Sequence, residues 1–259
     1  MGPVSPVSRF NFNLVALELT TLTSLIMLLR RSRDQRGERL FLVSLLTLVF
    51  FSSIGLVLDL LYRLVSIRYD QYAFSFGRAF GFPAFYIGRL FQCHRWFHDA
   101  SAWVYNVPLA AMLLLAALYY ITQPIQRGDQ YVRTVCIAFL LAPLIYVLVP
   151  IAGPAYAFPT FPNVAPVGLA PHIIHLPSQA APPNGLPSIH LTVALLLLYF
   201  ARRWRLGLIL GLIFVAFTVT STLGLGEHYT VDLLAAIPYT ALMIYLGGSE
   251  KPNDKSCQP

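Results

Sequence analysis

The sequence predicts an all-α fold, a polytopic membrane helical bundle, and three observations support this class. The first is composition: 57% of the 259 residues are hydrophobic and only 11% are charged. A soluble domain carries roughly a quarter of its residues as charged side chains, so this chain could not cover a water-facing surface. The second observation is a series of apolar runs of membrane-spanning length. The third is the placement of arginine between those runs.

A membrane-spanning helix needs about 20 mostly apolar residues. Runs of this kind lie near 12–30, 40–64, 102–121, 132–152, 187–202, 206–224 and 229–247. The run at 187–202 is short and begins at a proline, which is favourable at the first helical position because its missing N–H would be unpaired there. We therefore expect seven transmembrane helices, or six if the first run lies in the membrane interface.

Basic residues indicate how these helices are oriented. They gather in four segments after alternate runs: Arg30, Arg31, Arg33, Arg36 and Arg39; Arg127 and Arg133; Arg202, Arg203 and Arg205; and Lys251 and Lys255. With seven spans all four segments share one side, which the positive-inside rule identifies as cytoplasmic. The connections at 65–101, 153–186 and 225–228 then lie on the extracytoplasmic side. Because the net charge of +7 is spread over these short blocks, it does not indicate a nucleic-acid partner.

These patterns divide the chain into three parts. Residues 1–39 are expected to form an N-terminal transmembrane anchor and a basic loop, residues 40–247 the main membrane domain, and residues 248–259 a polar tail. The segment 65–101 is too polar to span, and its many aromatic residues and arginines suit the lipid headgroup layer. It is expected to be either an interfacial anchor or a lid that holds anionic headgroups through Arg78, Arg89 and Arg95.

Three ionisable residues in or beside the last spans are the main candidates for chemistry, because such residues are costly in a membrane. His190 lies near the start of one span. His228 and Asp232 lie one helical turn apart at the start of the last span, so we expect both side chains on one helix face. A carboxylate in that place can fix the tautomer of an imidazole and stabilise its protonated form. This set suits covalent phosphoryl transfer, in which one imidazole attacks phosphorus and a second protonates the leaving oxygen.

The motifs around these residues resemble those of a known family. Gly-Leu-Pro-Ser-Ile-His at 185–190, Ser-Thr at 221–222 and His-Tyr-Thr-Val-Asp at 228–232 are similar to the second and third motifs of the type-2 phosphatidic acid phosphatase superfamily. The resemblance covers roughly residues 100–247. It implies that His190 is the general acid, that His228 is the nucleophile and that Asp232 orients it. The expected phosphate-binding residues are Ser188, Gly185, Tyr156 and Thr222, the first two at a helix start whose dipole favours anions.

The sequence departs from this family in its cations. The phosphatases carry Ser-Arg where this chain has Ser221-Thr222, and their first motif has a lysine and an arginine where 153–159 has no cation. The altered pattern is similar to the inositol phosphorylceramide synthase branch. A phosphate monoester carries up to about two negative charges near neutral pH and a diester carries one, so fewer cations favour a diester.

The remaining candidates are weaker. His172 and His175 could contribute to acceptor binding or be ordinary loop residues. His94, His98 and Asp99 resemble a metal half-site by spacing alone, and the cysteines (Cys93, Cys136 and Cys257) form no ligand pattern, so we expect no metal and no cofactor. Glu227 could tune His228 or face water.

We therefore predict a membrane enzyme that transfers a phosphoryl-linked headgroup from a phospholipid diester, such as phosphatidylinositol, to a hydroxyl-bearing lipid or glycan acceptor. Its active site would lie on the extracytoplasmic face of the cell membrane. The alternatives are a phosphatidate or polyprenyl phosphate phosphatase, in which water replaces the acceptor, and a non-enzymatic lipid transporter or binding protein.

Overall fold

The computed structural model describes residues 56–57, 60–61, 63–105, 108–166, 168, 170–176 and 183–248. The predicted N-terminal anchor, most of the run at 40–64 and nearly all of the C-terminal tail lie outside these residues. Within them the chain is mostly helical, which confirms the predicted all-α class. The span count of six to seven stays a prediction.

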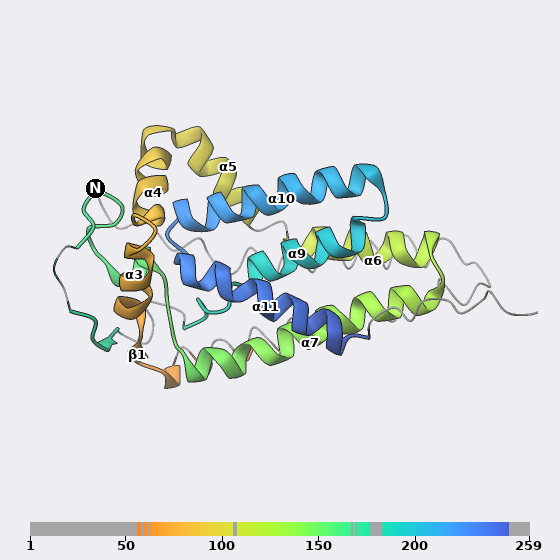
Figure 1. Ribbon diagram of the computed structural model, residues 1–259, viewed down its shortest axis with the longest axis horizontal. Helices are drawn as coiled ribbons and strands as arrows, with labels where there is room; N and C mark the ends of the chain where they lie inside the picture. Colours follow the sequence, from red (N-terminus) through yellow and green to blue (C-terminus); the bar gives the residue numbers. More distant parts are fainter. Residues whose placement is uncertain are drawn as a thin grey trace, which may run out of the picture.

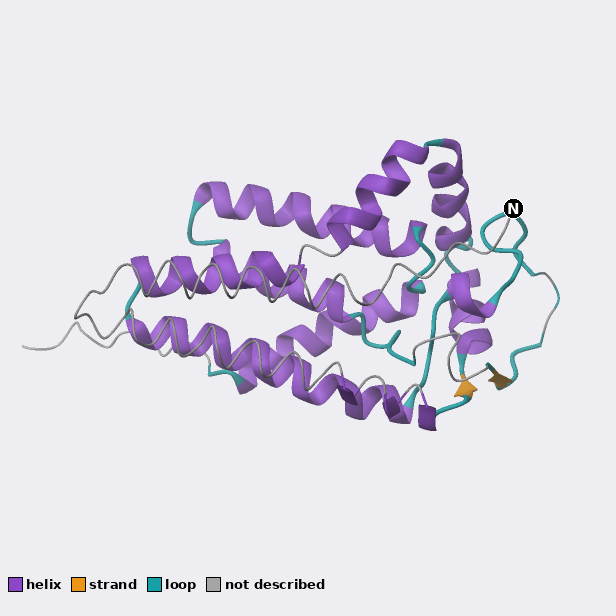
Figure 2. Ribbon diagram, turned by 180° about the vertical axis from the view of Figure 1, so that it is seen from behind, coloured by secondary structure: helices purple, strands orange, loops and turns teal. Residues whose placement is uncertain are grey.

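Five helices run side by side as a bundle (Figure 1): α6 (Pro108–Thr122), α7 (Ile125–Leu148), α9 (Ile189–Ala201), α10 (Arg205–Gly224) and α11 (Thr230–Leu246). Three shorter helices gather toward one end of the bundle: α3 (Asp70–Arg78), α4 (Pro83–Cys93) and α5 (Arg95–Tyr105). The turn from α10 to α11 lies at this end as well (Figures 1 and 2). A four-residue helix, α8 (Pro154–Ala157), follows α7, and the short strands β1 (Ile67–Arg68) and β2 (Ile174–His175) pair antiparallel.

Helices α9, α10 and α11 agree with their predicted apolar runs to within a few residues, whereas α7 begins before its run. Helices α7 and α10 are long and apolar enough to cross a membrane, and α9 and α11 are shorter apolar helices. Within the run at 102–121 the structure describes the end of α5, to Tyr105, and α6 from Pro108, and residues 106–107 lie outside the described residues. Proline has a fixed φ and no N–H, so it favours a helix start over a helix interior.

The start of α9 also differs from the prediction. The prediction that Pro187 occupies the first helical position is wrong, since α9 begins at Ile189. Ser188 is the N-cap, and its Oγ accepts a hydrogen bond from the backbone N–H of Leu191 at 3.3 Å. Serine is among the residues most favoured at this position, because its oxygen satisfies an otherwise unpaired N–H.

Tyrosine hydroxyls join the bundle helices to one another. Tyr119 of α6 donates to the carbonyl of Phe200 in α9 at 2.7 Å, and Tyr131 of α7 donates to the carbonyl of Met112 in α6 at 3.0 Å. Tyr239 of α11 donates to a carbonyl of α7. Such bonds place the phenol oxygen on a partner while the ring packs in the core. They hold α9 and α11, the helices that carry the candidate histidine motifs.

The segment 65–101 forms α3, α4 and most of α5. Its helices bury one aromatic face, with Phe74, Phe85 and Phe91 in the interior, and expose large side chains such as Tyr86 and Trp96. The segment is therefore a packed helical layer and not an extended loop.

A two-histidine candidate active site

The two histidines of the sequence motifs lie next to each other. His190 is the second residue of α9, and His228 lies in the turn between α10 and α11. Their ring centroids are 6.1 Å apart. His228 is 3% exposed and His190 is partly exposed. A backbone hydrogen bond from the N–H of Ser188 to the carbonyl of Asp232, 3.2 Å long, joins the two motifs directly.

Asp232 is fully buried beside His228. Its Oδ2 lies 3.4 Å from His228 Nδ1 and accepts the backbone N–H of Tyr229 at 2.8 Å. The prediction that His228 and Asp232 share one helix face is wrong, because His228 precedes α11 by two residues. The carboxylate instead turns back over the helix start, where its charge is also favoured by the helix dipole.

The turn that carries His228 is fixed by backbone hydrogen bonds. The carbonyl of Thr222 accepts the N–H groups of Glu227 at 3.0 Å and of His228 at 3.3 Å. Gly226 has φ +74°, a conformation that favours glycine. The geometry of His228 is thus set by the end of α10 as well as by α11.

The loop at 150–155, whose last two residues are the first two of α8, contacts both motifs. The carbonyl of Ile151 accepts the N–H of Gly185 at 2.7 Å, and the N–H of Ala155 donates to the carbonyl of Gly226 at 3.0 Å. A Cβ atom on Gly153, which has φ +128°, would lie 2.5 Å from the carbonyl oxygen of Glu227. This close approach requires glycine, so the loop is part of the support of His228.

Two of the four predicted phosphate-binding residues are engaged in these fold contacts. The N–H of Gly185 is bonded to Ile151, and the buried hydroxyl of Thr222 donates to the carbonyl of Thr218 in its own helix at 2.8 Å. The hydroxyl of Ser188 accepts the cap bond and keeps its own hydrogen for donation.

Tyr156 pairs with a carboxylate next to His228. Its hydroxyl lies 3.0 Å from both carboxylate oxygens of Glu227 and donates to them. Burial raises the pKa of Glu227, while His228 and the Tyr156 hydrogen bond oppose that rise. The site therefore has a second acidic side chain besides Asp232.

The other candidate residues do not join the His190–His228 pair. The side chains of Arg78, Arg89 and Arg95 are exposed, and Arg95 lies 4.0 Å from Asp99. The weaker candidate histidines lie outside the pair as well: His94, His98, His172 and His175. The Nδ1 atom of His98 lies 3.1 Å from a carboxylate oxygen of Asp99.

Four residues with notable contacts or burial were not predicted. The Tyr105 ring stacks on the His190 ring, with centroids 3.8 Å apart. Ser221 has a buried Oγ that, among the described residues, meets no hydrogen-bond partner. Asp70 is a fully buried carboxylate, and Arg68 is the one fully buried arginine in the part of the chain that the structure describes. The guanidinium of Arg68 donates to the carbonyls of its own segment, at Val65 and Ile67.

Sequence offered a signal for only one of these residues. Ser221 stands in the recognised Ser-Thr motif, whereas a lone aspartate or tyrosine in an aromatic segment has no distinguishing pattern. The contacts of Asp70 and Tyr105 come from segments distant in sequence.

The fold and the site define a helical, membrane-associated protein with paired histidines at the start of one helix and just before another. The family model described as the PAP2 superfamily matches residues 74–246, and the chain belongs to this superfamily. The resemblance to the type-2 phosphatidic acid phosphatases is thereby confirmed. The chain is an enzyme of the phosphatase and phosphotransferase type, acting on phosphorylated lipid substrates in membranes. Comparison with curated proteins and with solved structures gave no significant match.

Proposed function

We propose that this enzyme is a transferase that moves a phosphoryl-linked headgroup from a phospholipid diester to a hydroxyl acceptor, through a phospho-histidine on His228. The observation that carries the proposal is the arrangement of His190 at 6.1 Å from His228, with Asp232 at 3.4 Å from the latter. This spacing supports a reaction in which the phosphorus atom lies between the two rings, with His228 attacking it and His190 beside it.

The proposed reaction has two steps that conserve protons. His228 attacks phosphorus, the bond to the diacylglycerol oxygen breaks, and His190 supplies the proton that this oxygen takes up. The acceptor hydroxyl then gives its proton to His190 while its oxygen attacks phosphorus and releases His228. Asp232 stabilises the positive charge on the His228 ring during both steps.

The charges around His228 favour a diester as donor. Glu227 and Asp232 flank it, and the cations proposed for the lid (Arg78, Arg89 and Arg95) are exposed on α3, α4 and α5. A monoester with about two negative charges would be repelled by these carboxylates more strongly than a singly charged diester. Together with the Ser221-Thr222 sequence, this supports the inositol phosphorylceramide synthase-like branch.

The proposal includes the location of the reaction. The positive-inside pattern supports a position of the turn at 225–228 on the extracytoplasmic face of the cell membrane. The domain division into an anchor at 1–39, a membrane domain at 40–247 with the insert 65–101, and a tail at 248–259 belongs to the same proposal.

The test is lipid mass spectrometry on the purified protein in mixed micelles. We expect phosphatidylinositol or another phospholipid diester to be consumed faster than phosphatidic acid, and an added alcohol acceptor to increase donor turnover. The His228→Ala variant is the inactive control. Efficient hydrolysis of phosphatidic acid or a polyprenyl phosphate without an acceptor would replace the transferase with a phosphatase.

Restoring the arginine of the phosphatases at Thr222 is a poor test of this charge argument. Thr222 is fully buried, and its hydroxyl bonds to its own helix, so an arginine there would have to displace its neighbours. Substrate comparison on the unaltered chain avoids this problem.

A further inference from the structure

Asp70, the first residue of α3, is a buried carboxylate that the proposed mechanism does not use. It is 0% exposed, and a carboxylate in such a place is unfavourable unless it is hydrogen-bonded. Its Oδ1 accepts the N–H of Gly153 at 2.8 Å and the hydroxyl of Tyr229 at 2.9 Å. Its Oδ2 accepts the N–H of Ala152 at 3.0 Å. One side chain thus joins α3, the loop at 150–155 and the start of α11.

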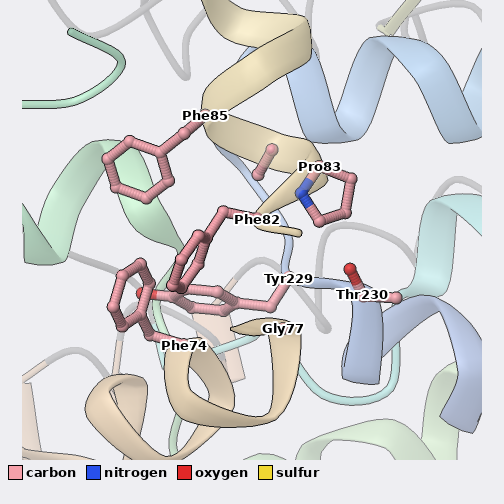
Figure 3. Close-up of a pocket in the computed structure, with 8 residues that line it drawn as sticks. Phe74, Gly77, Phe82, Pro83, Phe85, Tyr229 and Thr230 are labelled. Carbon is pink, nitrogen blue, oxygen red and sulfur yellow. The ribbon is translucent and has the colours of Figure 1, made fainter. Parts of the chain in front are cut away.

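Tyr229 connects this carboxylate to the candidate nucleophile. It follows His228 directly, and its backbone N–H donates to the Asp232 oxygen that lies 3.4 Å from His228 Nδ1. Its ring extends from the start of α11 toward Phe74 (Figure 3). Tyr229 is therefore held at its hydroxyl by Asp70 and engages Asp232 through its backbone.

The other two donors to Asp70 fix the opposite side of the same turn. Gly153 lies so close to Glu227 that a Cβ atom would collide with the Glu227 carbonyl. Holding the N–H groups of Ala152 and Gly153 therefore also limits where the residue before His228 can lie. The turn that carries His228 is restrained by Asp70 from two directions.

We propose that Asp70 is a positioning residue for His228, acting through Tyr229 and the loop at 150–155. This role rests on the proposed phosphoryl transfer to His228. Its consequence is that the helical layer α3–α5 controls the geometry of the nucleophile, although α3 contributes no group that reacts.

The test measures the rate at which phospho-histidine forms, by rapid quench with a labelled diester donor. We expect Asp70→Asn and Tyr229→Phe each to slow this step about 10-fold to 100-fold, because a small misplacement of a nucleophile has effects of that size. The KM should stay within about 3-fold of the wild-type value, because the substrate contacts are unchanged. The double variant should be about as slow as the slower single variant, since both changes weaken the same contact: Tyr229→Phe removes its donor, and Asp70→Asn removes the charge of its acceptor.

Two exposed residues of the same layer supply matched controls. Asp99→Asn and Tyr86→Phe make the same chemical changes away from the site and should leave the rate unchanged. Rates are normalised to folded protein, so that a role in stability alone would lower the yield and leave the rate per folded molecule unaltered.

The outcomes separate this role from the proposed function. If the wild type and the controls form phospho-histidine, and Asp70→Asn and Tyr229→Phe form it at the same rate, the positioning role is overturned and the proposed function stands. If the wild type forms none with any diester or monoester donor, the proposed function is overturned and the positioning role with it.

Discussion

Replacing Asp232 with asparagine tests the electrostatic part of the mechanism most directly. The change removes the negative charge and keeps the shape of the side chain. The amide oxygen of asparagine can still accept the N–H of Tyr229, which Asp232 Oδ2 accepts at 2.8 Å. The start of α11 should therefore keep its geometry.

The expected magnitude follows from the distance of 3.4 Å between Asp232 Oδ2 and His228 Nδ1. Two unit charges at that distance attract by about 5 kcal/mol at an effective dielectric constant of about 20. The attraction is present only when the His228 ring is positively charged, as it becomes when it bonds to phosphorus. Since about 1.4 kcal/mol corresponds to tenfold in rate, Asp232→Asn should slow phospho-histidine formation by about 10³-fold, a value below the full Coulomb limit.

The assay is rapid-quench trapping of the labelled phospho-enzyme, with Asp99→Asn as the control for loss of an exposed carboxylate. Thermal unfolding in the same detergent shows whether the variants are folded. A rate for Asp232→Asn within about 3-fold of the wild type would refute the reasoning, because a charge at 3.4 Å in a buried site could not then be stabilising the reacting ring.

Three further predictions concern the histidines, the topology and the buried acid. His228→Ala should lose both turnover and phospho-enzyme, whereas His190→Ala should lose turnover but still form phospho-enzyme slowly from a donor with a good leaving group, as radiolabel trapping would show. In a background without native cysteines, Ala165→Cys should react with an impermeant reagent in intact cells and Gln35→Cys should not; the reverse pattern would place the active site in the cytoplasm. Burial raises the pKa of Asp70 from 3.8 to about 6, so the native state binds this proton more tightly than the unfolded chain and stability should fall as pH rises between about 4 and 6. Asp70→Asn should remove about 3 kcal/mol of that pH dependence, measured by thermal unfolding across this range, and an unchanged profile would contradict it.

Periodicity and composition predicted the helices where the apolar runs are bounded by polar residues. Helix α10 matches its predicted run to within one residue, because arginines precede it and a glycine-containing turn follows it. The assignment of residues 102–105 to α5 was not predicted, since the apolar run at 102–121 continues without a break in hydropathy. The helices of the segment 65–101 were not predicted either, because their buried faces pack on the bundle and not on lipid.

The candidate site was predicted as residue types, and only its supporting contacts required the structure. Short motifs located His190, His228 and Asp232, because the spacing of residues in one motif is local. No local pattern relates Asp70 to Tyr229, which is 159 residues further along the chain. The stacking of Tyr105 on His190 depends in the same way on two helices, because Tyr105 is the last residue of α5 and His190 lies at the start of α9.

The position of Asp70 also bears on the charge of the substrate. The N–H groups of Ala152 and Gly153 point at an anion, and in this chain that anion is the Asp70 carboxylate of the protein itself. Those two donors are therefore not available to a phosphate. They lie in the segment that corresponds to the first motif of the phosphatases, where those proteins carry cations. The start of α9 and the imidazole rings, when they are protonated, contribute positive potential at the site. Because the Asp70 carboxylate occupies these donors, the site can neutralise a singly charged phosphodiester better than a doubly charged monoester. This is the physical reason to expect a phosphodiester donor.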